Sequence, residues 1–196
     1  MNIPNMLTVS RLVLAPVFFI IYFLPEWTGG NAALFTWVLA AVYLVIELTD
    51  LLDGYIARRY NLVTDIGKVM DPFADVFSRI TYFVCFTVSG IMPAWVFLII
   101  LYRELSVTFL RMIMMKRGTA MAASVFGKIK AVIYAASSFL GICYIALIRL
   151  DILASWVSPL FSVLQAVFIL GAAASLFSLS GYLRAAFSPS HENKRK

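Results

Sequence analysis

The chain has 196 residues, of which 62% are hydrophobic and only 13% are charged, and its mean hydropathy is +0.92. An ordinary soluble domain is about half apolar and a quarter charged, so this composition excludes a soluble globular protein. Sixteen Lys and Arg against ten Asp and Glu give a net charge of +6, which in so apolar a chain indicates cytoplasmic loops beside anionic lipid rather than nucleic-acid binding.

Six apolar stretches are long enough to cross a membrane, because a transmembrane helix needs roughly 20 apolar residues. They lie at residues 8–25, 33–56, 70–91, 93–115, 125–148 and 155–183. The first stretch has no basic start and no small-residue cleavage site, so we expect a retained span rather than a signal peptide. The sequence thus predicts an all-α integral membrane bundle of six transmembrane helices over residues 1–187, followed by a polar cytoplasmic tail at 188–196.

Basic residues give the expected orientation of this bundle, because cytoplasmic loops hold an excess of Lys and Arg. When both termini are placed in the cytoplasm, the loops on that side carry nearly all the basic residues outside the spans, and Arg149 alone falls on the outer side. We therefore expect a multi-pass protein of the inner, cytoplasmic membrane with both termini cytoplasmic.

Acidic residues inside the predicted spans are the strongest functional signal, because an ionised carboxylate in a membrane helix is costly unless it is paired or binds a metal. Asp50 and Asp53 share one face of the second span, and Asp71 and Asp75 share one face of the third. The short loop between these spans makes them antiparallel neighbours, so the four carboxylates are expected to converge near the cytoplasmic surface. Such an all-oxygen cluster favours Mg²⁺ or Mn²⁺, and two ions could clamp a diphosphate during phosphoryl-type transfer.

Small residues follow the second aspartate. Gly54 and Ala57 leave room for a flat or phosphate-bearing group to lie against the helix, and Arg58 stands beside that surface. The alternative interpretation of these two small residues is close helix packing, which is common in membranes.

The full pattern is Asp50-x2-Asp53-Gly54-x2-Ala57-Arg58-x8-Gly67-x3-Asp71-x3-Asp75, and it resembles the signature of the CDP-alcohol phosphatidyltransferase family. The chain is most similar to the phosphatidylglycerophosphate synthase branch of that family. Further residues that carry the resemblance are Asn5, Thr8, Arg11, Arg103, Glu104, Arg111, Gly127, Lys128 and Lys130.

The resemblance implies a six-helix membrane enzyme, usually a homodimer, that transfers a phosphatidyl group from CDP-diacylglycerol to an alcohol and releases CMP. It implies that Asp50, Asp53 and Asp71 hold the metal ions, and that Asp75 both binds metal and acts as the general base. The catalytic carboxylates it implies are Asp71 and Asp75. The residues that would hold the CDP-lipid are Asn5, Thr8, Gly54, Ala57, Arg58 and Gly67.

The acceptor alcohol is expected to be sn-glycerol 3-phosphate. A phosphorylated acceptor brings about two negative charges and needs cations near the metal site. The candidate cations are Arg103, Arg111, Lys128 and Lys130, and Glu104 is expected to point elsewhere on its helix.

The branch usually has Lys where this chain has Val76 and Thr where it has Ala131. The alternative is therefore another acceptor, of the inositol phosphate, serine, choline or ethanolamine type. The alternative from a different class is a divalent-cation transporter. Gly54, Ala57 and Arg58 argue against it, because cation passage gains nothing from an arginine beside the carboxylates.

Two further charges lie about one turn deeper in the membrane than the aspartates. Glu47 precedes Asp50 by three residues, and Arg79 follows Asp75 by four. Because the two helices are antiparallel, these charges are expected at similar depth, and we predict a Glu47–Arg79 salt bridge at the floor of the site. The alternative interpretation has Arg79 bonded directly to Asp75.

Overall fold

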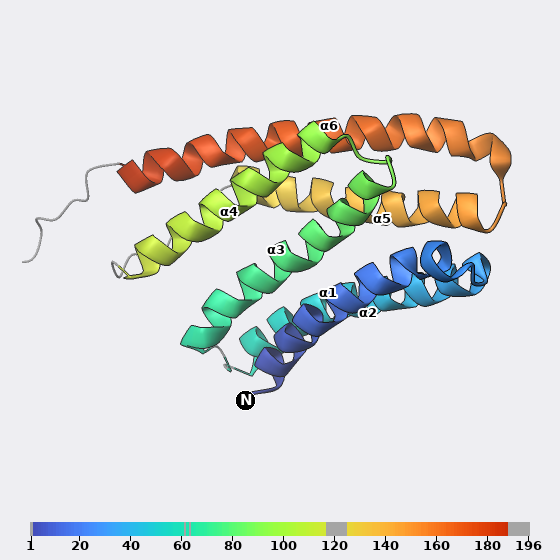
Figure 1. The fold of residues 1–196 in the computed structure, drawn as a ribbon. Helices are drawn as coiled ribbons and strands as arrows, with labels where there is room; N and C mark the ends of the chain where they lie inside the picture. The colour runs from blue at the N-terminus through green and yellow to red at the C-terminus, as the bar shows by residue number, and fades with distance from the viewer. Residues whose placement is uncertain (1, 61, 63, 117–124, 188–196) are drawn as a thin grey trace, which may run out of the picture.

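The computed structural model describes residues 2–60, 62, 64–116 and 125–187. Its helices, in chain order, are α1 (Ile3–Thr28), α2 (Ala32–Arg59), α3 (Asp65–Val88), α4 (Ala94–Lys116), α5 (Val125–Arg149) and α6 (Ala154–Phe187) (Figure 1). Each predicted apolar stretch coincides with one of these helices, which confirms the all-α prediction. The predicted polar tail at 188–196 lies outside the described residues.

The connections on either side of α2 are set by local capping. Gly29 ends α1 with a positive φ of 65°, and the Asn31 side chain then accepts hydrogen bonds from the backbone amides of Ala33 and Leu34. At the other end of α2, the Thr64 side chain accepts from the Gly67 amide and starts α3 at Asp65, five residues before the predicted span begins. This early start holds Gly67 and Asp71 on one continuous helix.

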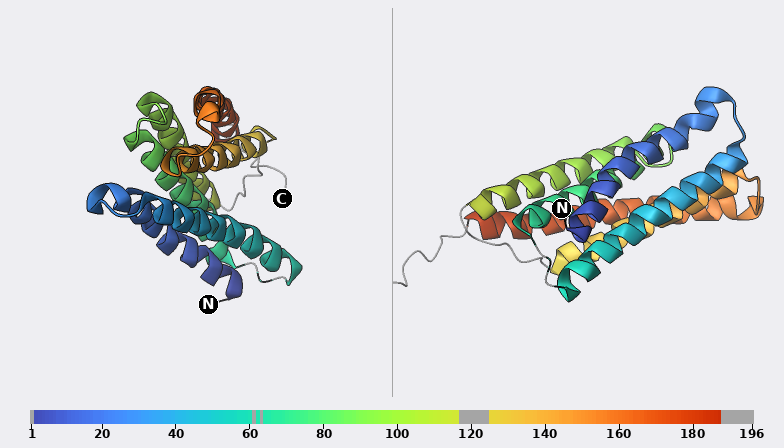
Figure 2. Two further views of the ribbon diagram at one scale, coloured as in Figure 1. Left: turned by 90° about the vertical axis from the view of Figure 1, so that its right-hand side faces the viewer. Right: turned by 90° about the horizontal axis from the view of Figure 1, so that it is seen from below.

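The helices form two groups joined by α3. In the first group α1 packs against α2 and α3, and in the second α6 packs against α4 and α5 (Figure 2). Buried aromatic side chains fill the space between the groups, including Phe18 from α1, Phe83 and Phe86 from α3, and Phe168 from α6. Gly141 on α5 is required there, since a Cβ at this position would lie 2.4 Å from the Phe86 ring.

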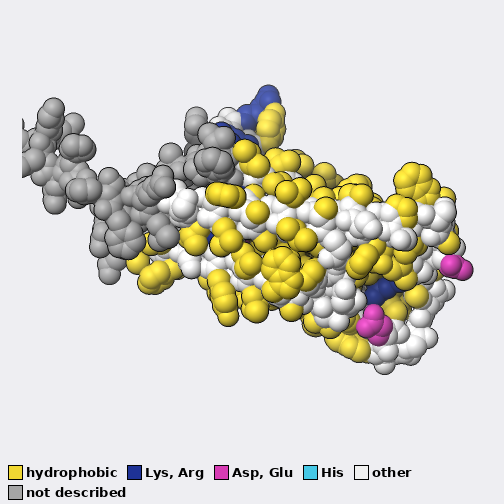
Figure 3. Space-filling view, turned by 90° about the horizontal axis from the view of Figure 1, so that it is seen from above, with side chains coloured by type: hydrophobic (Ala, Val, Ile, Leu, Met, Phe, Trp, Pro, Cys, Tyr) yellow, Lys and Arg dark blue, Asp and Glu magenta, His cyan; other side chains and the backbone are white. Residues whose placement is uncertain are grey.

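Four of the described helical segments are long and apolar enough to cross a membrane, namely Ile3–Thr28, Ala32–Arg59, Gly127–Arg149 and Ala154–Gly181. Large hydrophobic side chains cover much of the face in Figure 3, as expected for a surface that contacts lipid rather than water. The other two helices, α3 and α4, carry Asp71, Asp75, Arg79, Arg103 and Arg111 of the predicted site. The chain is therefore an all-helical membrane protein, with four candidate spans among its helices.

Candidate active site

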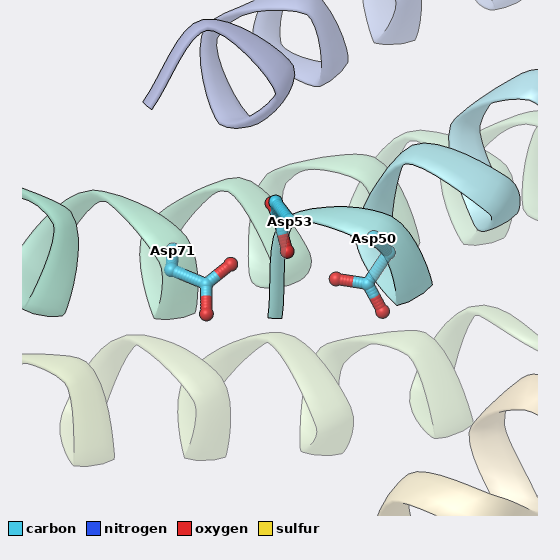
Figure 4. A group of neighbouring side chains, drawn as sticks. All are labelled: Asp50, Asp53 and Asp71. Carbon is cyan, nitrogen blue, oxygen red and sulfur yellow. The ribbon is translucent and has the colours of Figure 1, made fainter. Parts of the chain in front are cut away.

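Carboxylates from two helices meet at one point, as their spacing predicts. Asp50 and Asp53 on α2 and Asp71 on α3 each offer a carboxylate oxygen, and these oxygens lie within 4.8 Å of one another (Figure 4). Asp53 is buried, whereas Asp50, Asp71 and Asp75 are half-buried. The cluster is therefore open on one side, as a binding site must be.

Arg11 of α1 lies among all four aspartates. Its side chain is 1% exposed and forms ion pairs with Asp50, Asp53, Asp71 and Asp75, including 2.6 Å from Nη2 to Asp53 Oδ2. Sequence reasoning did not assign Arg11 to this cluster. The available signal was that a basic residue within an apolar helix needs an anionic partner, but the sequence offers several such partners.

The cluster is suited to bind divalent cations. Four carboxylates face the single positive charge of Arg11, so negative charge remains in excess among these five side chains. The guanidinium also shows that the carboxylates converge on a common cation position, and an all-oxygen donor set is the kind that Mg²⁺ and Mn²⁺ prefer. The residues present thus fit the predicted metal site.

A pocket of about 190 Å³ adjoins the cluster between α1, α2 and the start of α3. Its lining includes all the predicted CDP-lipid residues, which are Asn5, Thr8, Gly54, Ala57, Arg58 and Gly67. Thr8 also donates a hydrogen bond of 3.0 Å to Asp53 Oδ2, which links this pocket to the cluster. The atoms nearest to a Cβ built on Gly54 belong to the Arg58 guanidinium, at 3.5 Å, and not to another helix, so the absent side chain leaves room in the pocket.

A second pocket of about 270 Å³ adjoins the cluster on its other side, between α3, α4 and α5. Asp75 lines it together with all the predicted acceptor cations, which are Arg103, Arg111, Lys128 and Lys130. The aspartate cluster therefore adjoins one pocket that is lined by small residues and a second pocket that is lined by several cations.

Glu104 differs from its prediction. Instead of pointing elsewhere, it is 6% exposed and accepts hydrogen bonds from Arg103 Nη1 at 3.0 Å and from Lys130 Nζ at 2.5 Å. Arg103 Nη2 also donates to Ser178 Oγ at 2.7 Å, so one polar network joins α4, α5 and α6. The prediction failed because it considered only directions on one helix, whereas long buried charged side chains bend toward whichever counter-charge the packing provides.

The predicted Glu47–Arg79 salt bridge is also absent. Among the described side chains, neither residue forms an ion pair within 4.0 Å, and Arg79 does not bond to Asp75 either. Arg79 Nη1 instead donates to the Ala131 carbonyl oxygen on α5 at 3.3 Å, and the side chain lines the larger pocket. The prediction considered α2 and α3 alone, while α5 packs against α3 and supplies a competing acceptor.

The Glu104 network gives a stability prediction. Glu104→Gln leaves the buried charges of Arg103 and Lys130 without their common carboxylate, and we expect a loss of about 3–5 kcal/mol in the free energy of unfolding. Ser178→Ala removes one neutral acceptor from the same network and should cost about 1 kcal/mol. Unfolding of the detergent-solubilised protein measures both, and equal losses in the two variants would contradict an ionic role for Glu104.

Known proteins resemble this chain over most of its length. Residues 1–174 match the profile of the CDP-alcohol phosphatidyltransferase family. A CDP-diacylglycerol–glycerol-3-phosphate 3-phosphatidyltransferase of Treponema pallidum (strain Nichols) is 31% identical over 194 residues, which are 95% of this chain and 90% of that protein. The enzyme of the same name from Bacillus subtilis (strain 168) is 36% identical over 135 residues, covering 66% of this chain and 70% of the relative.

A protein named probable phosphatidylglycerophosphate synthase, from Mycobacterium tuberculosis (strain CDC 1551 / Oshkosh), is 37% identical over 134 residues, covering 68% of this chain and 62% of the relative. The family match includes both helices that carry the aspartate cluster and the segments that line the two pockets. The chain belongs to the CDP-alcohol phosphatidyltransferase family.

Proposed function

We propose that this chain is a membrane enzyme of phospholipid biosynthesis that transfers the phosphatidyl group of CDP-diacylglycerol to sn-glycerol 3-phosphate. The products are phosphatidylglycerol phosphate and CMP. The observation that carries this proposal is the aspartate cluster between a pocket with Gly54 and Ala57 and a second, cation-lined pocket. The names of the Treponema pallidum and Bacillus subtilis relatives support the same acceptor.

The reaction follows from this arrangement. A hydroxyl oxygen of glycerol 3-phosphate attacks the phosphorus that carries diacylglycerol, and the bond from that phosphorus to the bridging oxygen breaks, so that CMP leaves with this oxygen. Asp75 borders the acceptor pocket and accepts the hydroxyl proton. The four aspartates would hold two Mg²⁺ or Mn²⁺ ions, which when bound supply positive charge to the diphosphate and to the leaving phosphate.

The chain's own side chains hold the two substrates on either side of the cluster. Arg58, with Asn5 and Thr8, contacts the CDP part in the smaller pocket, where the missing side chain of Gly54 leaves room. In the larger pocket, Arg111 and its cationic neighbours bind the acceptor phosphate by charge-assisted hydrogen bonds.

The proposed topology has all six helices in the inner, cytoplasmic membrane, with both termini and the metal site on the cytoplasmic side. The basic residues Arg58 and Arg59 at the end of α2 support this orientation, because the aspartate cluster lies near the same end of that helix.

The proposed assembly is a homodimer, as the family resemblance implies. Measuring the mass of the purified protein in detergent tests this assembly.

The acceptor assignment is tested by incubating the purified protein with radiolabelled CDP-diacylglycerol, Mg²⁺ or Mn²⁺, and a panel of alcohols. We expect labelled phosphatidylglycerol phosphate with glycerol 3-phosphate, in preference to products from inositol phosphate, serine, choline or ethanolamine. Preference for an unphosphorylated alcohol would contradict the assignment.

The cations of the larger pocket give a kinetic prediction. Lys128→Ala and Arg111→Ala should each raise the KM for glycerol 3-phosphate by about 10- to 100-fold, because each removes charge-assisted hydrogen bonds worth about 1.5–3 kcal/mol. The KM for CDP-diacylglycerol should change little, since neither residue lines the smaller pocket. Steady-state kinetics with each substrate varied in turn measures both values, and equal increases would contradict the division between the pockets.

A further inference from the structure

We propose that Arg79 binds the phosphate of the acceptor and thereby sets the enzyme's preference for a phosphorylated alcohol. This inference rests on the proposed function. Arg79 lies on α3, four residues after Asp75, so the two side chains share one face of the helix. Both line the larger pocket, together with the cations of α4 and α5.

The charges around this pocket are not equally available to a ligand. Arg103 and Lys130 already share the carboxylate of Glu104. Arg79 is half-buried, and among the described residues its hydrogen-bond partner is a neutral backbone oxygen, Ala131 O, at 3.3 Å. A guanidinium has five N–H donors, so most of those on Arg79 remain for an anion.

A guanidinium in an apolar helix bundle is stabilised when an anion bonds it directly, and none of the described carboxylates lies within 4.0 Å of Arg79. Glu47 on α2 borders the same small space as Arg79, but the two side chains form no direct ion pair. The two side chains border a separate space of about 10 Å³, which holds a single water at most. An anion that enters the larger pocket is therefore the partner that this geometry provides.

The spacing of Arg79 and Asp75 matches the proposed acceptor. Four residues along a helix correspond to a rise of about 6 Å. In extended glycerol 3-phosphate, a terminal hydroxyl oxygen is separated from phosphorus by five bonds, or about 6 Å. Arg79 can thus hold the phosphate through its planar pair of donors while Asp75 meets the hydroxyl at the other end of the molecule.

The experiment compares the wild type with Arg79→Gln, Arg79→Lys and a matched control, Arg59→Gln. Arg59 is exposed, contacts Tyr55 and borders neither pocket. We expect Arg79→Gln to raise the KM for glycerol 3-phosphate by about 10- to 100-fold and to weaken competitive inhibition by inorganic phosphate to a similar extent. The KM for CDP-diacylglycerol should stay within about twofold of the wild type, and Arg59→Gln should change none of these values. Arg79→Lys keeps the charge but loses the planar pair of donors, so its KM for glycerol 3-phosphate should rise by at least about threefold.

Two results would overturn the role of Arg79. One is an unchanged KM for glycerol 3-phosphate in Arg79→Gln or, if that variant does not fold, in Arg79→Lys. The other is a Glu47→Gln variant that reproduces the KM increase of Arg79→Gln, because Arg79 would then act as the partner of Glu47.

The wild-type acceptor panel separates this inference from the proposed function. If the wild type uses glycerol 3-phosphate and Arg79→Gln keeps its KM, only the inference fails. If the wild type prefers an unphosphorylated alcohol, the proposed function itself fails.

Discussion

Asp53→Asn is expected to lower the rate of CMP release by about three orders of magnitude or more, while the protein still folds. The substitution keeps the shape of the side chain and removes one negative charge from the centre of the cluster, where Asp53 is 3% exposed and bonded to Thr8 and Arg11. Asp50→Asn and Asp71→Asn should have similar effects. CMP release from radiolabelled CDP-diacylglycerol at saturating Mg²⁺ or Mn²⁺ measures each loss.

Asp75→Asn should lose activity to a similar degree but retain more metal and CDP-lipid binding, because it mainly removes the proton acceptor. Mn²⁺ binding followed by electron paramagnetic resonance distinguishes this variant from the other three. Asp151→Asn is the matched control, since Asp151 is exposed at the α5–α6 connection and has a positive φ that asparagine tolerates. Equal loss of Mn²⁺ binding in all four cluster variants would refute the separate role of Asp75, and near-normal turnover in any one variant would remove that residue from the catalytic set.

Arg11→Gln is expected to destabilise the metal-free protein strongly and the metal-loaded protein much less. Removing one partner from a buried ionic cluster costs about 3–5 kcal/mol, and Arg11 is the residue through which α1 binds the aspartates of both α2 and α3. Bound divalent ions supply the missing positive charge, so saturating Mn²⁺ should recover most of that loss.

Thermal unfolding in detergent, with either EDTA or Mn²⁺, measures this difference. Arg149→Gln is the matched control, because Arg149 is also largely buried but bonds the Tyr22 carbonyl oxygen at 2.7 Å, outside the aspartate cluster. Its loss of stability should be the same under both conditions. If Arg11→Gln also loses the same amount with and without Mn²⁺, then Arg11 does not stand in for the metal charge.

The positions of the helices and of the aspartates could be predicted from the sequence because both depend on local patterns. An apolar stretch of about 20 residues specifies a helix wherever it packs, and the short connection before α3 makes α2 and α3 antiparallel. The spacing of Asp50 and Asp53, and of Asp71 and Asp75, then fixes which helix faces carry the carboxylates. The residues that line the two pockets include those that the family resemblance and the charge pattern implied, and their roles in substrate binding stay predictions.

The partners of the long charged side chains were decided only by the tertiary structure. The sequence shows that Arg11, Arg79 and Glu104 each need a partner, but each side chain can reach several neighbours, and the choice depends on how separate helices pack. The packing of α1 against both α2 and α3 brings Arg11 to all four aspartates. The approach of α5 to α3 gives Arg79 a backbone carbonyl in place of Glu47. The contact of α6 with α4 brings Ser178 to Arg103. Lys130 of α5 shares the Glu104 carboxylate with Arg103. Helix periodicity is a property of neighbouring residues, whereas the pairing of buried charges is a property of the whole bundle.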